Sequence, residues 1–192
     1  MSPSRQALET AYLIDRLERL GRLDEHQAGL NPAQWDALRY LARANRFSRT
    51  PAALADYLAS TRGTVSRTIA SLEEKGHVSR AASARDGRSV VLELTPRAEQ
   101  LLRRDPLFAL ARDIQRATGA GTTAVLAALR GVLRGALARN GGRAFGICAR
   151  CRHFRRNARP SSHQPHHCSL LDEPLSQTDG EAICVEQEPA AA

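Results

Sequence analysis

The chain has 192 residues, of which 42% are hydrophobic, and it carries a formal net charge of +8. This length accommodates one ordinary domain with an appendage and excludes two separate enzymatic domains. Nearly all of the basic side chains are arginines, which suit phosphate and base-edge recognition better than lysines do. The surplus lies in residues 1–140, which hold 22 basic and 14 acidic residues, whereas residues 141–192 hold six of each. We therefore expect the first part of the chain to attract an anionic partner.

The first thirty residues carry five acidic residues among their apolar positions, so they lack the uncharged core of a signal peptide. No uninterrupted apolar run approaches the roughly 20 residues that a membrane span needs. We therefore expect a cytoplasmic protein without a membrane partner. In a reducing cytosol, an even set of four cysteines is more typical of a metal site than of structural disulfides.

Apolar residues recur at helical spacing in four segments of the first half of the chain. Asn or Thr followed by Pro begins two of these segments, as is typical of capped helices. We expect these helices over residues 8–20 or 8–28, 32–45, 51–58 and 62–75.

A β-hairpin is expected after the fourth helix. Apolar residues alternate over residues 89–94, and a turn with Gly87 separates this segment from residues 78–80. Two more helices are then predicted, the first over residues 96–114 with a bend at Pro106, whose nitrogen cannot donate a hydrogen bond. The last helix runs from about residue 122 to 137. The predicted fold class is therefore mainly α with a small β-hairpin wing.

The third and fourth helices are joined by almost nothing, which is the geometry of a helix-turn-helix. Small hydroxyl and arginine side chains on the fourth helix are the candidates for contact with DNA: Arg62, Thr64, Ser66 and Arg67. An ordinary solvated helix face would have a similar composition. The arginine-rich hairpin turn favours DNA binding, because Arg85 and Arg88 can reach the minor groove or the phosphate backbone.

Residues 30–102 resemble the winged helix-turn-helix of the MarR family of bacterial regulators, and a weak resemblance extends over residues 1–140. Its most specific part is Arg85-Asp86-Gly87-Arg88-Ser89 with the strand that follows, and residues 72–76 match the end of the recognition helix. The resemblance implies that Arg88 enters the minor groove while Asp86 helps to hold the wing. It also implies a homodimer, formed by the first, fifth and sixth helices, that reads a pseudo-palindromic operator in double-stranded DNA.

The fifth and sixth helices are apolar over more of their circumference than an isolated surface helix needs. This pattern supports the implied dimer interface. Packing of these faces within one chain is the alternative.

Residues 141–192 form a second predicted unit, a small irregular module whose four cysteines read C-x2-C-x16-C-x15-C. Four thiolates hold either Zn²⁺ or a [4Fe-4S] cluster. A zinc ribbon usually has two close cysteine pairs, whereas here a single pair precedes two lone cysteines. This spacing is similar to that of high-potential iron-sulfur proteins. The predicted ligands are Cys148, Cys151, Cys168 and Cys184.

Other residues of the module are predicted to surround the four cysteines. Four arginines between residues 150 and 156 would offset the negative charge of a cluster or form a second DNA-phosphate patch. Phe145, Phe154, Leu170 and Leu171 are predicted to exclude solvent, and the four histidines between residues 153 and 167 are interpreted as solvated loop residues. Zinc, a thiol-disulfide switch and a disordered tail remain alternatives.

The sequence thus predicts a dimeric DNA-binding regulator, not an enzyme, because no nucleophile, base and acid constellation lies beside the cysteines. The cysteine-bound [4Fe-4S] cluster would sense redox state, oxygen, nitric oxide or iron and would act through the dimer helices. The alternative is a structural zinc site, with regulation by a small organic molecule.

Overall fold

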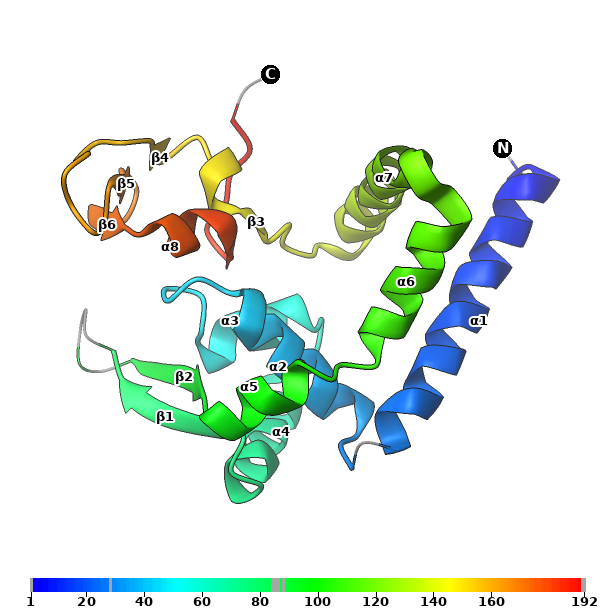
Figure 1. Ribbon diagram of the computed structural model, residues 1–192, viewed down its shortest axis with the longest axis horizontal. Helices are drawn as coiled ribbons and strands as arrows, with labels where there is room; N and C mark the ends of the chain where they lie inside the picture. Colours follow the sequence, from blue (N-terminus) through cyan, green and yellow to red (C-terminus); the bar gives the residue numbers. More distant parts are fainter. Residues whose placement is uncertain (1, 28, 84–86, 88, 191–192) are drawn as a thin grey trace.

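The computed structural model describes residues 2–27, 29–83, 87 and 89–190 (Figure 1). The order of its elements up to residue 140 is α1 (Arg5–Gln27), α2 (Pro32–Arg43), α3 (Pro51–Tyr57), α4 (Arg62–Glu74), β1 (Val78–Ala82), β2 (Val90–Leu94), α5 (Pro96–Leu102), α6 (Leu107–Thr118), η1 (Gly119–Gly121) and α7 (Thr122–Asn140). Short elements follow: β3 (Gly146–Ile147), η2 (Cys148–Arg150), β4 (Phe154–Arg155), β5 (His166–Cys168), β6 (Glu173–Leu175), α8 (Gln177–Glu181) and β7 (Ile183–Cys184). We call residues 32–102 the winged-helix lobe, α1 with α6 and α7 the arm, and residues 141–190 the cysteine module.

Local sequence signals place the helices of the winged-helix lobe. The Asn31 side chain accepts a hydrogen bond from the backbone of Gln34, whose own side chain accepts one in return from Asn31. Thr50, Thr61 and Thr95 each cap a helix by accepting from the N–H three residues later. Such caps satisfy backbone donors that have no partner within the helix. The predicted helix starts in this lobe are therefore confirmed.

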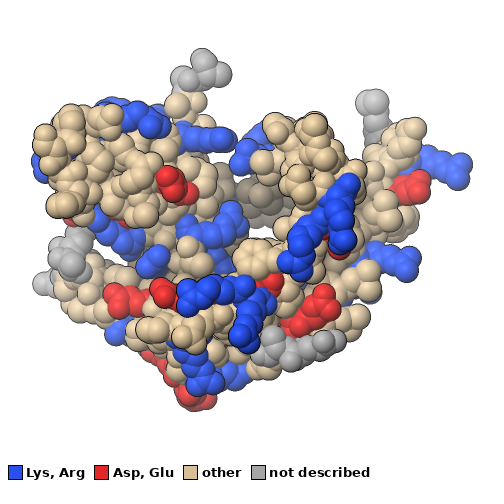
Figure 2. Space-filling view, in the orientation of Figure 1, with Lys and Arg blue, Asp and Glu red and all other residues tan. Residues whose placement is uncertain are grey.

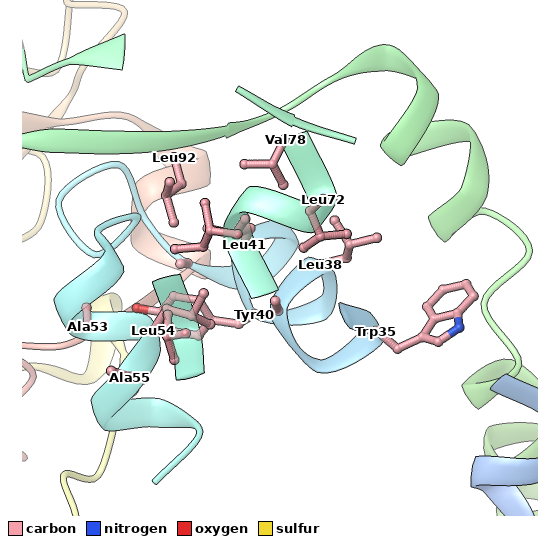
Figure 3. Packing of buried hydrophobic residues seen from close by; sticks show 14 of the residues in the cluster. Trp35, Leu38, Tyr40, Leu41, Ala53, Leu54, Ala55, Leu72, Val78 and Leu92 are labelled. Atoms are coloured by element: carbon pink, nitrogen blue, oxygen red, sulfur yellow. The ribbon is translucent and has the colours of Figure 1, made fainter. Parts of the chain in front are cut away.

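The core of the winged-helix lobe lies where α2 meets α3, α4 and the hairpin (Figure 3). Large side chains from each of these elements are fully or almost fully buried there: Trp35, Leu38, Tyr40, Leu41, Leu54, Ile69, Leu72, Val78 and Leu92. β1 and β2 pair antiparallel, with Val78 opposite Leu94. The N–H of Leu92 donates to the carbonyl of Arg49 at 2.7 Å, which fastens the hairpin to the chain before α3.

The segment 96–114 is two helices, not the single bent helix that the sequence predicts. α5 ends at Leu102 and α6 begins at Leu107, and Asp105 between them accepts the N–H of Leu107 at 2.8 Å. Arg39 donates to Asp105 at 2.5 and 2.8 Å and also pairs with Glu25. This buried ion network fixes the break, because it ties Asp105 to α2 and to the end of α1.

The arm extends away from the winged-helix lobe, with α1 and α6 side by side in Figure 1. Neither α6 nor α7 has a buried residue. Large apolar side chains on these helices and on α1 are exposed, among them Tyr12 at 67% and Val132 at 62%. No helix among the described residues is long and apolar enough to cross a membrane.

The cysteine module folds back onto the winged-helix lobe after α7 ends at Gly141, which has a left-handed backbone conformation with φ of 64°. β3 pairs with β7, and β4, β5 and β6 form a small antiparallel sheet. Phe145 and Ile183 join the core of the winged-helix lobe, where the Phe145 ring packs edge-on against Tyr40 and Tyr57. Phe145 therefore lies in that core. The prediction that it shields the cysteines from solvent is wrong.

Candidate nucleic-acid interface and cysteine site

The predicted DNA contacts on α4 are exposed but do not all lie on one face of the helix. Val65, Ile69 and Leu72 are buried against the lobe. Helical periodicity places Arg67 opposite this buried row, on the outer face, with Thr64 and Ser66 at its two edges. Arg62, in the first turn, lies nearer the buried row, and all four side chains are exposed.

These four side chains differ in how freely they can reach a partner. Arg62 pairs with Asp56 at 3.3 Å, and the hydroxyl of Thr64 lies 2.9 Å from that of Thr61, the helix cap. Ser66 and Arg67 form no side-chain hydrogen bond or ion pair with any described residue. The outer face of α4 thus offers one free hydroxyl and one free guanidinium.

The predicted wing contacts Arg85, Asp86 and Arg88 lie outside the described residues. At the base of the hairpin, Arg80 pairs with Glu73 at 3.1 Å. Figure 2 shows arginine side chains over both the winged-helix lobe and the arm, with acidic side chains between them. On this view the positive charge is distributed and does not form a single patch.

The four predicted metal ligands come together within the cysteine module. Cys148, Cys168 and Cys184 are buried in one cluster with Leu175, and Cys151 lies close enough to influence the ionisation of Cys148. Each of the four is a free thiol. Backbone hydrogen bonds hold them in place, from Cys151 N–H to the Cys148 carbonyl and from Cys148 N–H to the Ala182 carbonyl, both at 2.9 Å. We call these four residues the cysteine site.

Burial controls the ionisation of the cysteine site. Together with the nearby Cys184, Cys168 and Cys151, it raises the pKa of the Cys148 thiol to about 12. Burial also raises the pKa of the Cys184 thiol, and the nearby polar groups of Asn45, Ser48 and Glu186 oppose that rise. Without a cation these two groups are neutral thiols at physiological pH. A metal bound there must displace their protons.

The apolar wall of the cysteine site comes from both parts of the chain. Phe154 and Leu171 pack against the buried cysteines, as predicted, and Phe47 from the winged-helix lobe joins them. Leu170 is 44% exposed and does not contribute. The Arg46 guanidinium stacks over the Phe47 ring at 4.6 Å and pairs with Asp179 at 3.3 Å.

Three of the four histidines do not fit their interpretation as solvated loop residues. The His153 and His167 side chains are 19% and 20% exposed and lie beside Glu188 and Asp172. His166 is only 3% exposed, its Nδ1 accepts the N–H of Asn157 at 3.1 Å, and its Nε2 lies 3.0 Å from Gln177 Oε1. Its ring also packs on Phe154. His166 is thus a structural residue whose two ring nitrogens are both occupied, whereas His163 is exposed as predicted.

The arginines near the cysteine site are exposed. Arg152 pairs with Glu188 at 2.6 Å, and Arg156 lies over the Phe154 ring at 6.0 Å. Arg150 and Arg155 form no ion pair with any residue that the structure describes. Within the described parts of the chain, no group of three or more His, Cys, Asp or Glu side chains is arranged to hold a metal ion.

Sequence reasoning missed the contribution of the winged-helix lobe to the cysteine site. Asn45, Phe47 and Ser48 lie between α2 and α3, and nothing in their local pattern distinguishes them from an ordinary turn at the end of a helix. Their partners lie more than 130 residues later in the chain. Only the three-dimensional structure reveals this contact.

An apolar cavity of about 590 Å³ lies between the arm and α2. α1 contributes Leu13, Ile14 and Leu17, while α6 and α7 contribute Leu110 and Leu129. Arg39 and Glu25 of the ion network line one side. This cavity opens between the arm and the winged-helix lobe.

Residues 28–89 match the model of the MarR family. The MepR-DNA complex from S. aureus is 19% identical, with a TM-score of 0.54, covering 69% of this chain and 96% of that one. A MarR/EmrR family transcriptional regulator from Acinetobacter sp. ADP1 is 21% identical, with a TM-score of 0.54 and coverages of 70% and 95%. NadR in complex with 4-hydroxyphenylacetate is 22% identical, with a TM-score of 0.57 and coverages of 69% and 94%. No curated protein sequence is significantly similar to this chain.

These comparisons show that the chain has the winged-helix fold of the MarR type. The share of the chain that these structures leave uncovered is close in size to the cysteine module. The likeness therefore concerns the winged-helix lobe and the arm.

Proposed function

We propose that this protein is a DNA-binding transcription regulator of the MarR type and not an enzyme. The outer face of α4 carries the proposal, because Ser66 and Arg67 project there without any partner in the described structure. A helix-turn-helix uses this face to read base edges in the major groove. The MarR family match over residues 28–89 and the DNA-bound MepR structure of the same fold support this function.

The active form is proposed to be a homodimer built by the arm. A monomer would leave a continuous apolar surface on α1, α6 and α7 in contact with water, which soluble proteins rarely do. Two-fold symmetry would present two α4 helices to half-sites about one DNA turn apart. A pseudo-palindromic operator in double-stranded DNA is the expected partner.

Operator binding by matched arginine variants tests this function. Arg67→Ala should weaken operator affinity by about 1–3 kcal/mol, and Arg88→Ala should lower both the affinity and its salt dependence, because each variant removes a DNA contact. Arg116→Ala is the control, since it removes the same charge from α6, where Arg116 pairs with Asp113. Equal affinities for all four proteins across a salt series would contradict the proposal.

The cysteine site is proposed to hold a [4Fe-4S] cluster that regulates operator affinity. Cys148, Cys168 and Cys184 are buried behind Phe47, Phe154 and Leu171, and Cys151 lies beside Cys148. The cysteine spacing supports the cluster over a zinc ribbon, because one close pair is followed by two single cysteines and not by a second close pair. When bound, the cluster would supply a centre that responds to oxygen, nitric oxide, iron or redox state.

A structural zinc site, with a small organic effector, is the second candidate. The apolar cavity beneath the arm supports it, since a volume of about 590 Å³ suits a small molecule. NadR, which shares the fold, was solved with 4-hydroxyphenylacetate. In this case zinc would fix the cysteine module, and the effector would act at the arm.

The visible spectrum of protein purified without oxygen separates the two candidates, with iron, sulfide and zinc assayed on the same sample. Broad visible absorption with about four iron and four sulfide per chain supports the cluster. A colourless protein with one zinc per chain replaces it with the structural site. Regulation by the cluster requires in addition that the holo and apo forms differ in operator affinity.

A further inference from the structure

Residues 44–50, between α2 and α3, fasten both neighbours of Cys184 to the winged-helix lobe. We call this segment the α2–α3 turn. The N–H of Asn45 donates to the carbonyl of Ile183 at 2.9 Å, and Ala44 pairs with Ile183 in a parallel bridge. The N–H of Val185 donates to Ser48 Oγ at 2.9 Å. Cys184 is therefore held from both sides by the lobe that carries α4.

Asn45 and Ser48 form a buried pair beside the Cys184 thiol. They are 2% and 0% exposed, and Asn45 Oδ1 accepts from Ser48 N–H at 3.0 Å and from Ser48 Oγ–H at 2.7 Å. The Nδ2 group of Asn45 is buried and has no hydrogen-bond partner among the described residues. The pair is thus fixed through Asn45 Oδ1 and lies against the strand that carries Cys184.

The α2–α3 turn is also bonded to the elements that face DNA. The Tyr40 hydroxyl donates to the Ser48 carbonyl at 2.6 Å, and Leu92 of β2 donates to the Arg49 carbonyl at 2.7 Å. Thr50 at the end of the turn caps α3. A displacement of Ser48 thus reaches α3 and the hairpin through a few hydrogen bonds, without passing through α6 or α7.

We propose that Asn45 and Ser48 are positioning residues that join the Cys184 ligand to α3 and β2, so that gain or loss of the metal centre moves the DNA-binding surface of the same protomer. This inference rests on the proposed function of the cysteine site. It differs from the sequence-based hypothesis, in which the module acts on the dimer helices. The module follows α7 in sequence, but beyond the helix cap at Gly142 its described hydrogen bonds to the rest of the chain go to the lobe.

Hydrogen exchange on the full chain tests this route directly. The protein is loaded with ferrous iron and sulfide and compared with the same protein after oxidative loss of the metal centre. We expect the amides of Asn45 and Val185 to exchange at least about tenfold faster after the loss, with α7 unchanged. A change confined to α6 and α7, or none in residues 44–58, would overturn the inference.

Asn45→Asp tests the buried pair, because it keeps the Oδ1 acceptor for Ser48 and places a negative charge beside the Cys184 strand. Asn157→Asp is the matched control, since it makes the same change at an exposed position of the module. We expect Asn45→Asp to shorten the lifetime of visible absorption in air several-fold and Asn157→Asp to leave it unchanged. Equal lifetimes in two folded variants would argue against the positioning role.

Operator affinity, measured with and without the metal centre, separates the two levels of the proposal. Equal affinities together with altered exchange in residues 44–58 would remove the sensing function and leave the positioning role intact. Different affinities with unaltered exchange there would remove the positioning role alone.

Discussion

The winged-helix lobe and the cysteine module differ in what stabilises them. The lobe buries apolar side chains from every one of its elements, including the large Trp35, Leu54 and Ile69. In the module only Leu175 and three cysteines form a separate buried cluster, and its other buried apolar residues, Phe145 and Ile183, belong to the lobe's core. A small unit with so little apolar core depends on cross-links or docking. We therefore expect the lobe to fold by apolar packing alone and the module to need its bound metal centre.

Cys148→Ser should have the largest effect, because Cys148 is buried among the other three cysteines. We expect loss of most bound iron and sulfide, together with rapid proteolysis of residues 141–190, while the lobe keeps its cooperative unfolding transition. Metal assays and limited proteolysis measure both effects. Ser169→Ala, an exposed change beside Cys168, is the control. Unchanged metal content in Cys148→Ser would remove that residue from the ligand set.

Leu54→Ala tests the other side of this comparison. Its side chain is 0% exposed in the core of the lobe, so the variant should lose about 2–5 kcal/mol of unfolding free energy. Metal content per folded chain should stay the same. Leu170→Ala, at an exposed position in the module, should change stability by less than about 0.5 kcal/mol. Denaturant unfolding measures both changes. Similar losses of unfolding free energy in the two variants would contradict the difference between the lobe and the module.

Leu133→Glu tests whether the exposed arm belongs to a dimer. Leu133 is 56% exposed in the single chain, so a glutamate there costs little unless a partner covers it. We expect a dimer dissociation constant raised about 10- to 100-fold, measured by sedimentation, with little change in the secondary structure. A dimer of unchanged strength would place the interface elsewhere.

The smallest expected effect concerns the pH dependence of the lobe. Burial, helped by Arg97 and Lys75, lowers the pKa of His77, so below about pH 6.5 the unfolded chain binds more protons than the folded chain. The contribution of the neutral imidazole is complete above that pH and is lost as pH falls through the folded pKa. His77→Gln should therefore flatten the fall in unfolding midpoint between about pH 7 and 5. An unchanged slope would show that other groups cause it.

The sequence predicted the parts of the structure that depend on neighbouring residues. Caps such as Thr50 and Thr61 lie within three residues of the groups they bind, so the helix starts of the lobe were predictable. The break between α5 and α6 was not, because Arg39 and Asp105 that fix it are 66 residues apart. The docking of Ile183 beside Ala44 is still more distant in sequence. For the wing residues Arg85, Asp86 and Arg88 the sequence remains the only source.

For the candidate sites too, the sequence predicted what depends on local spacing and not what depends on the surroundings in the fold. The α4 face followed from helical periodicity, and the structure gathers the four predicted cysteine ligands. The roles assigned to Phe145 and His166 were wrong, because aromatic and imidazole side chains suit a core as well as a metal site. No spacing rule distinguishes the two uses.

The path of residues 141–144 has a mechanical consequence. The chain leaves the arm at Gly141 and enters the core of the lobe at Phe145, so a tether of four residues spans the two parts. Fully extended, four residues reach about 14 Å. Arm and lobe are thus connected three times: here, between α1 and α2, and through the link between α5 and α6. These connections limit how far the arm can move relative to the lobe. A molecule bound in the cavity between the arm and α2 would therefore strain the segment at Phe145, which also holds the module on the lobe.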